Sequence, residues 1–275
     1  LPAEAGKINT ETGSTLTGNY LAGNHAQAKR ELSTAVGFFN AALKRAPLSL
    51  DLLHRMFTLL VAEGRFEEAK EVAQKLIKLN SKTSLAHLTL AIYEIKQGNY
   101  KLANNQLSEI APEGLIGLVS PLLRAWCLIG QKKNSLALKI LKRPGKQTAI
   151  HNLYSTQLAL IKDFLGRSNE AKTHYLNTRN SRNELSLRTV QLLGALYERT
   201  GEKNKAKDLY ESYLLQFPDS QLLNQPLGRL KTEKEETLDS ITIIDGVAEV
   251  LFDISSLLQL QDDQRNPLVL GRLAI

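Results

Sequence analysis

The sequence predicts an all-α protein, specifically a right-handed α-solenoid of antiparallel helix pairs. Glycines recur at nearly equal intervals, with gaps of 34, 32, 36 and 35 residues between Gly64, Gly98, Gly130, Gly166 and Gly201. In four of the five cases an alanine follows the glycine five residues later. A period of this length is typical of stacked helical repeats, each of which packs on its neighbours along one continuous core.

The clearest repeat unit runs from Leu187 to Asp219. Apolar residues in its first half follow the helical period, and Gly201 is placed to end that helix in a left-handed conformation. That conformation costs a residue with a side chain roughly 1–2 kcal/mol. The second half places Ala206 and Tyr210 on one face and ends before Pro218, which cannot continue a helix. We therefore predict two antiparallel helices, joined by a short turn, that pack on each other.

This unit resembles the tetratricopeptide repeat, a 34-residue helix–turn–helix. The residues that carry the resemblance, each at the family's offset, are Leu193, Gly194, Tyr197, Gly201, Ala206, Tyr210 and Pro218. Further copies begin at Leu16, Leu50, Ser84 and Asn152, and the first of them has Arg30 where the turn glycine would stand. The resemblance covers residues 16–219 and implies an array of about six helix pairs.

The unit around residues 116–143 departs most from the pattern. It keeps Gly130 as the turn glycine but has Ser135 in place of the alanine. Ser120 and Pro121 have the character of an N-cap and a first helical residue. We therefore predict that the first helix of this unit is shortened or kinked.

Three segments lie outside the predicted array. Residues 1–15 are polar and without helical period, which predicts a flexible N-terminal segment. Residues 220–240 are rich in charge and break the period, which predicts a linker or long loop. Residues 241–275 predict a further helix pair that begins with a long amphipathic helix at 241–260. Because the apolar pattern is still running at Ile275, we expect this pair to be truncated and the array to continue in a longer protein.

The segments GNYLAGNHAQ and GVAEVLFDISSLL are similar to a family of exported bacterial tetratricopeptide proteins. This narrower resemblance implies a place in the bacterial periplasm or cell envelope, and a cytoplasmic location is the alternative. We also expect that a segment was removed upstream of Leu1, by cleavage of a secretory signal or by trimming.

Composition and charge argue against a membrane span and against nucleic acid as a partner, and they leave an acidic partner open. No uninterrupted apolar run reaches 18 residues, so no membrane span is predicted. The 35 Lys and Arg residues exceed the 28 Asp and Glu residues and give a net charge of +7. Six of the basic residues lie between Lys132 and Lys146 without an acid, either as a solvated helix face or as a patch for an acidic partner. No aromatic residues alternate with these lysines, so nucleic acid is not an expected partner.

The residue pattern gives no sign of catalysis or of cofactor binding. None of the five histidines has a second His or Cys three or four positions on, so no local metal site is predicted. The sequence has no glycine-rich phosphate loop and no serine nucleophile elbow. The single cysteine, Cys127, lies in an apolar segment and is predicted to be a small buried hydrophobe. We therefore predict that the chain is not an enzyme and holds neither a metal nor a cofactor.

The resemblance implies that a ligand binds in a concave groove lined by the first helix of each unit. The predicted partner-binding residues are Tyr20, Asn24, His54, Arg55, Thr58, Leu88, Ile92, Arg124, Arg188 and Gln191. This groove would be polar at its start, apolar in its middle and basic further on, which suits a peptide with an acidic end. The Lys and Asn clamp with which some family members grip a peptide carboxylate is incomplete, because Tyr20 and His54 occupy the lysine position.

The sequence thus predicts a non-enzymatic scaffold that binds a partner protein or peptide. One alternative is a substrate-recruiting N-terminal module of a larger enzyme, which further sequence downstream would reveal. Another is a self-assembling envelope protein that packs copies through the apolar helix at 241–260, and the sequence leaves the oligomeric state open.

Overall fold

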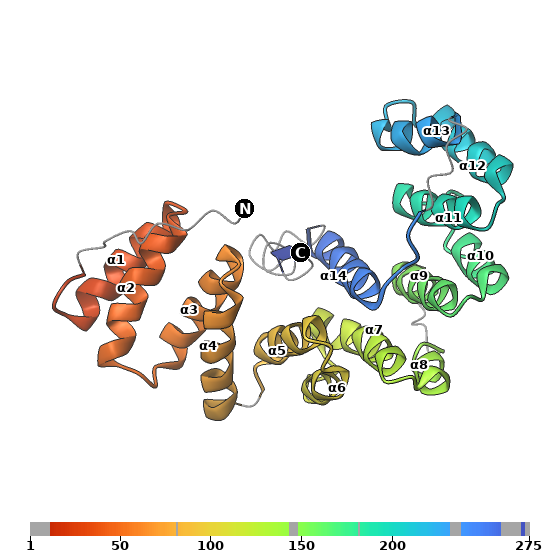
Figure 1. Ribbon diagram of the computed structural model, residues 1–275. Helices are drawn as coiled ribbons and strands as arrows, with labels where there is room; N and C mark the ends of the chain where they lie inside the picture. Colours follow the sequence, from red (N-terminus) through yellow and green to blue (C-terminus); the bar gives the residue numbers. More distant parts are fainter. Residues whose placement is uncertain are drawn as a thin grey trace. The chain divides into compact units, whose positions relative to one another are not determined.

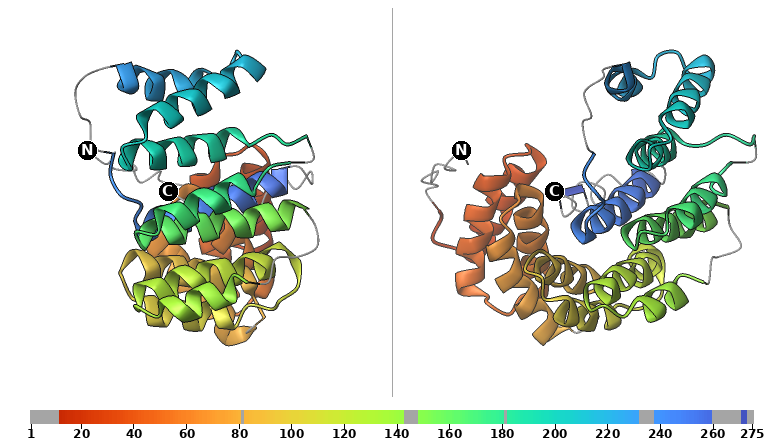
Figure 2. Two further views of the ribbon diagram at one scale, coloured as in Figure 1. Left: turned by 90° about the vertical axis from the view of Figure 1, so that its right-hand side faces the viewer. Right: turned by 45° about the vertical axis from the view of Figure 1, so that its right-hand side comes forward.

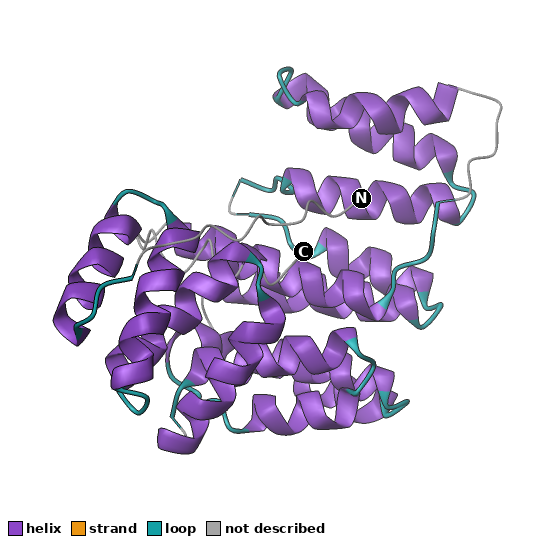
Figure 3. Ribbon diagram, turned by 60° about the vertical axis from the view of Figure 1, so that its left-hand side comes forward, coloured by secondary structure: helices purple, strands orange, loops and turns teal. Residues whose placement is uncertain are grey.

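The computed structural model describes residues 12–80, 82–142, 148–180, 182–231, 238–259 and 271–272. Throughout these ranges the regular elements are α-helices, with one short 3-10 helix and no strand (Figures 1 and 3). Consecutive helices pack on one another as pairs. The predicted all-α class with repeated helix pairs is therefore confirmed.

The chain divides into two compact units, one formed by residues 1–120 with 251–275 and the other by residues 121–250. In the first unit consecutive helices from α1 to α6 are in contact with one another (Figure 2). Its core is built from side chains such as Phe39, Phe57, Leu60 and Leu76, each of which is fully buried. Its helices are α1 (Leu16–Ala28), α2 (Leu32–Arg45), α3 (Leu50–Glu63), α4 (Phe66–Leu79), α5 (Ser84–Lys96), α6 (Tyr100–Ser108) and the start of α7 (Gly114–Gly130).

The second unit repeats the same principle, with consecutive helices from α9 to α13 in contact. Glycine lets its helices approach closely, because a Cβ atom on Gly194 would lie 2.2 Å from the ring of Tyr210. The helices are the rest of α7, α8 (Asn134–Ile140), α9 (Thr148–Phe164), α10 (Ser168–Leu176), α11 (Leu187–Arg199), α12 (Lys203–Gln216), η1 (Gln221–Leu223), α13 (Asn224–Lys231) and the first half of α14 (Ile243–Gln259).

The turn inside each helix pair contains one residue with left-handed backbone geometry. Four of the predicted turn glycines hold this place, with φ between 72° and 78° at Gly64, Gly98, Gly166 and Gly201. In the first pair Arg30 has φ 62°, as its alignment with the turn glycines predicts. In the fourth pair the prediction was wrong: Gly130 is the last residue of α7, and the left-handed residue is Lys132, with φ 60°.

Replacing Arg30 or Lys132 by glycine is expected to stabilise the protein by roughly 0.5–1 kcal/mol. The left-handed conformation costs a side-chain residue about 1–2 kcal/mol, and the greater backbone entropy that glycine loses on folding offsets about 0.5–1 kcal/mol of that gain. Both side chains are exposed, so little packing is lost. Chemical denaturation measures the change. The reverse substitution Gly201→Ala is the control, because no atom lies within 4 Å of the added Cβ and only the backbone conformation opposes it. A lower stability of Arg30→Gly would contradict the prediction.

The first helix of the fourth pair is not shortened, contrary to the sequence prediction. Helix α7 begins at Gly114 and passes through Pro121, so Ser120 is not its N-cap. The Ser120 hydroxyl instead donates a hydrogen bond to the Leu107 carbonyl over 2.7 Å. Val119 and Leu122, on either side of this dipeptide, are both fully buried. Burial on both sides of Pro121 favours helix despite the one backbone hydrogen bond that proline cannot make.

The segments outside the array are partly described. Helix α1 begins directly after Thr15, whose side chain caps it by accepting a hydrogen bond from the Gly18 amide over 3.0 Å. The predicted linker at 220–240 contains η1 and α13, which the sequence analysis missed. The predicted helix at 241–260 is present as α14. Residues 1–11 and most of the predicted last helix lie outside the described residues.

The turn between α11 and α12 is held by a carboxylate, Glu202, at the start of α12. It accepts hydrogen bonds from the Lys172 amine, from the Lys205 amine over 2.5 Å and from the Thr200 hydroxyl over 3.0 Å. These hydrogen bonds lower the pKa of Glu202 to about 2, and the bond from Lys172 makes the largest contribution. The pKa in the folded protein therefore lies below that in the unfolded chain, and this carboxylate stabilises the fold when it is ionised.

We expect part of the protein's stability to depend on pH through this carboxylate. The contribution of Glu202 is fully present above the unfolded pKa and is lost as the pH falls toward the folded pKa of about 2. Glu202→Gln should therefore flatten the decline in stability between about pH 4.5 and pH 2, which denaturant titrations at stepwise pH would record. Glu211→Gln, which removes an exposed carboxylate of α12, is the matched control. Equal slopes for the native chain and Glu202→Gln would contradict the prediction.

Candidate functional site

Five of the predicted binding residues come together on the first helices of the first two repeats, α1 and α3. The Arg55 guanidinium donates a hydrogen bond to the Asn24 side chain over 3.1 Å and lies 5.3 Å from the centre of the Tyr20 ring. It also bonds Asp51, one turn earlier in α3, over 3.0 Å. The name α1–α3 cluster is used below for Tyr20, Asn24, His54, Arg55 and Thr58.

The α1–α3 cluster is partly exposed, and its side chains are held in place. The side chain of Arg55 is 33% exposed, and the other four residues are also half-buried. His54 bonds the Leu50 carbonyl through its Nδ1 atom over 2.8 Å, and the Thr58 hydroxyl donates to the His54 carbonyl over 2.9 Å. The cluster is therefore an ordered polar surface that joins two consecutive repeats.

The predicted apolar middle of the groove is not an accessible surface. Leu88 and Ile92 in α5 are 0% and 3% exposed, so both belong to the core, and this part of the prediction is corrected. The reason is that every residue from Ala86 to Ile92 is buried. This stretch, which includes the polar His87 and Thr89, is covered on all sides of the helix, and the repeat register alone does not reveal this.

In the second unit the predicted residues Arg188 and Gln191 lie together on α11. Arg188 donates a hydrogen bond to the Gln191 side chain over 3.3 Å. It also donates from Nε to one carboxylate oxygen of Glu249 in α14 over 3.1 Å, and from Nη2 to the other oxygen. The third predicted residue, Arg124 in α7, is half-buried. Part of the predicted binding surface is therefore engaged by another helix of the same chain.

The same helix, α14, meets Trp126 of α7. Trp126 is fully buried, and its indole N–H donates to the Gln157 side-chain oxygen over 2.8 Å. A Cβ atom added to Gly246 would lie 2.0 Å from the indole ring, so the α14 backbone rests on the ring itself. No sequence motif or repeat position marked Trp126, Gly246 or Glu249 as part of a binding surface. A glycine inside a helical pattern is unfavourable relative to alanine, so Gly246 was a signal that a packing reason exists at this position.

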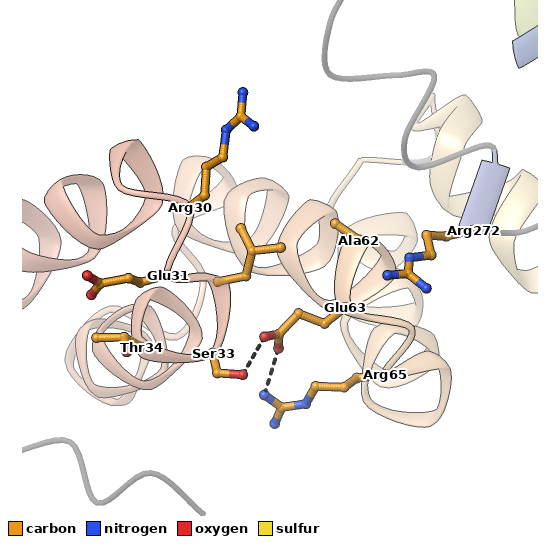
Figure 4. Close-up of a pocket in the computed structure, with 9 residues that line it drawn as sticks. Arg30, Glu31, Ser33, Thr34, Ala62, Glu63, Arg65 and Arg272 are labelled. Carbon is orange, nitrogen blue, oxygen red and sulfur yellow. Dashed lines mark hydrogen bonds and ion pairs between the residues drawn. The ribbon is translucent and has the colours of Figure 1, made fainter. Parts of the chain in front are cut away.

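Other features of the first unit bear less directly on binding. A hollow of about 520 Å³ opens between the α1–α2 and α3–α4 turns, where Arg30, Glu63, Arg65 and Arg272 are among the lining residues (Figure 4). Figure 4 shows the Glu63 carboxylate directed at Ser33 and at Arg65, with which it forms a hydrogen bond and an ion pair. The charge of Glu63 is thus compensated within the hollow.

The second unit holds the cysteine and the basic stretch that the sequence analysis singled out. Cys127 is buried as predicted, and burial raises the pKa of its thiol to about 12 despite the opposing charge of Arg124. Lys132, Lys133, Lys139 and Lys142 are exposed, and the rest of the basic stretch lies outside the described residues. A patch for an acidic partner stays a prediction.

Two negative findings apply to the part of the chain that the structure describes. No group of three or more His, Cys, Asp or Glu side chains there could hold a metal ion. No helix in the same ranges is long and apolar enough to cross a membrane.

Comparison with known proteins gives two family matches. Residues 58–83, at the end of α3 and in α4, and residues 191–220, in α11 and α12, each match a family model described as tetratricopeptide repeat. No curated protein matches the sequence.

Solved structures similar to this chain include MamA, with 15% identity over 82% of this chain and 98% of that one, at a TM-score of 0.36. The tetratricopeptide domain of P58(IPK) is 14% identical over 94% of this chain and 87% of its own length, at a TM-score of 0.34. A structure of Naa15/Naa10 bound to HypK is 14% identical over 94% of this chain and 51% of that chain, at a TM-score of 0.31. At this level of similarity these structures carry no argument about what the present chain binds.

Proposed function

We propose that this chain, which carries tetratricopeptide repeats, is a non-enzymatic interaction scaffold that binds a partner protein or peptide along the first helices of its repeats. Helical repeat arrays present extended surfaces to other proteins. The observation that carries the proposal is the α1–α3 cluster, in which polar and aromatic side chains from two consecutive repeats form one ordered and partly exposed surface.

The chemistry of this cluster favours a partner segment with an acidic group. The Arg55 guanidinium pairs with Asp51 and is also oriented by Asn24 and by the Tyr20 ring, and a guanidinium can donate a further charge-assisted hydrogen bond to a carboxylate of a partner. The net charge of +7 would also speed the approach of an acidic partner. Partly exposed Tyr and Arg are residue types that dominate the energy of protein interfaces. No nucleic acid is proposed as a partner.

The cellular location that goes with this proposal is the bacterial periplasm or cell envelope. It is supported only by the similarity of two segments to exported bacterial tetratricopeptide proteins. Fractionation of cells that produce the full-length protein distinguishes this location from the cytoplasm.

The test is an affinity capture from the native organism, followed by titration of the captured protein with purified chain. Arg55→Glu is expected to weaken binding at least tenfold, because it replaces the attraction of an acidic group by repulsion. A tenfold change corresponds to about 1.4 kcal/mol. The control is Lys78→Glu, which makes the same charge reversal at an exposed site on α4, a second helix.

Circular dichroism first establishes that both variants fold. If Arg55→Glu binds the captured protein as tightly as Lys78→Glu does, the α1–α3 cluster is not the binding surface. If the purified chain binds no captured protein directly, the scaffold proposal itself fails.

A further inference from the structure

We propose that the first-helix face of the second unit is a binding site for an amphipathic helix, and that the first half of α14 fills it as an internal ligand. A partner helix of the same chemistry would bind by displacing α14. This inference rests on the proposed scaffold function and deepens it, because it specifies the kind of partner that the second unit takes. The name helix seat is used below for Trp126, Gln157 and Arg188, with Gln191 beside them.

The first anchor of the helix seat is the contact between Trp126 and Gly246. The hydrogen bond to Gln157 fixes the plane of the indole, and the Phe164 ring meets it edge-on with centroids 6.1 Å apart. A Cβ atom on Gly246 would lie 2.0–2.5 Å from three atoms of that ring. No side chain fits at such distances, so this position of the bound helix requires glycine.

The second anchor is the ion pair between Arg188 and Glu249, three residues beyond Gly246. Both carboxylate oxygens accept hydrogen bonds from the guanidinium, which is the geometry of a bidentate pair. The Glu249 side chain is 11% exposed, so the carboxylate is largely removed from water. Residues three apart lie on the same face of a helix, and both anchors therefore hold one face of α14.

The buried residues next to these two anchors on α14 are apolar. Val247 and Val250 are 4% and 0% exposed. Counted from the glycine, α14 therefore has an apolar residue one position on, an acid three positions on and a second apolar residue four positions on. We therefore infer that the partner carries an amphipathic helix with this spacing, in which the glycine and the acid provide the specificity.

The way in which α14 is held distinguishes it from the helices of the repeats. Each helix from α9 to α13 packs on its neighbour in the sequence. Helix α14 instead bonds Arg188, 61 positions back, and contacts Trp126, which lies still further back in the sequence. Arg188 and Gln191 are two of the residues at which the repeat register places a ligand. Within this unit α14 thus occupies the place of a ligand.

Trp126 is the single tryptophan of the sequence, so its fluorescence reports directly on the helix seat. The experiment compares the full chain with its Gly246→Val variant and uses a synthetic peptide of residues 241–260 as the probe. The valine would displace α14 from the indole, so acrylamide should quench the variant's fluorescence more strongly. The peptide should bind the variant at least tenfold more tightly than the native chain and restore the weaker quenching.

A charge swap tests the second anchor. A peptide with Glu249→Lys should bind the Gly246→Val chain at least tenfold more weakly than the native peptide does. It should recover much of that loss on a chain that carries both Gly246→Val and Arg188→Glu. A peptide with Gly246→Val is the negative control, because its valine would meet Trp126 as the chain's own valine does.

If the Gly246→Val chain does not fold, the full chain with Glu249→Lys takes its place, since it weakens α14 without a steric clash. The proposal is overturned if a folded variant binds the native peptide no more tightly than the native chain does. It is also overturned if neither variant folds, because α14 is then an obligatory part of the core. This assay uses no captured partner and does not involve Arg55, so its failure is distinguishable from failure of the scaffold proposal.

Discussion

Trp126→Ala is expected to lower the free energy of unfolding by about 3–5 kcal/mol, the range seen when a large buried aromatic side chain is deleted. Trp126 is fully buried and contacts the backbone of α14 at Gly246. Its removal leaves a cavity. It also removes the hydrogen bond that the Gln157 side-chain oxygen accepts from the indole N–H over 2.8 Å. Equilibrium denaturation followed by far-ultraviolet circular dichroism measures the loss, because the variant has no tryptophan fluorescence.

Trp126→Phe separates the volume of this side chain from its hydrogen bond. Phenylalanine keeps an aromatic ring against Gly246 and Phe164 but has no N–H group for Gln157. We expect a smaller loss than for alanine, about 1–3 kcal/mol, which is the cost of leaving a buried acceptor without its donor.

A loss below about 1 kcal/mol for Trp126→Ala would mean that the site collapses without a cavity and that Trp126 is not a central packing residue.

The features of the fold that depend on short-range requirements were predictable from the sequence. A left-handed backbone conformation at a turn is a local requirement that favours glycine. The periodic glycines therefore predicted the positions of four turns, and alignment of the repeats predicted a fifth at Arg30. The fourth turn was misplaced because its left-handed residue, Lys132, has a side chain and the nearby Gly130 drew the assignment. Pro121 was misread because a local rule for proline does not include the burial on both sides of it.

The candidate site was predictable only in part, for a related reason. The repeat register identified the helix face on which Tyr20, Asn24 and Arg55 meet. It did not distinguish an exposed position from a covered one, so it included Leu88, which is buried. It also gave no sign that Arg188 bonds Glu249, because no local pattern connects residues 61 positions apart. Which surface is open is a property of the tertiary structure.

Arg199→Met is expected to destabilise the protein by about 3–5 kcal/mol, because it leaves one member of a buried ion pair without its partner. Arg199 in α11 and Asp163 in α9 form an ion pair, and their side chains are 14% and 9% exposed. Burial raises the pKa of Asp163, and the positive charge of Arg199 opposes that rise. Methionine fills part of the space of the arginine but cannot offset the charge of the carboxylate.

The pH dependence of this loss identifies its cause. Without Arg199 the pKa of Asp163 should rise further above its unfolded value, so the native state of the variant binds a proton more readily than the unfolded state. The destabilisation should therefore be greatest at neutral pH and shrink as the pH falls toward the unfolded pKa of about 4. A cavity or a lost packing contact would not give this dependence.

The double variant Arg199→Met with Asp163→Leu tests whether the unpaired Asp163 carboxylate causes the loss of stability. Replacing both members of a buried ion pair by apolar residues is often neutral, because neither charge then has to be removed from water. We expect the double variant to recover most of the stability that Arg199→Met loses and to show none of its pH dependence. If the two substitutions instead destabilise additively, the ion pair does not couple α9 to α11, and the large cost of Arg199→Met has another origin.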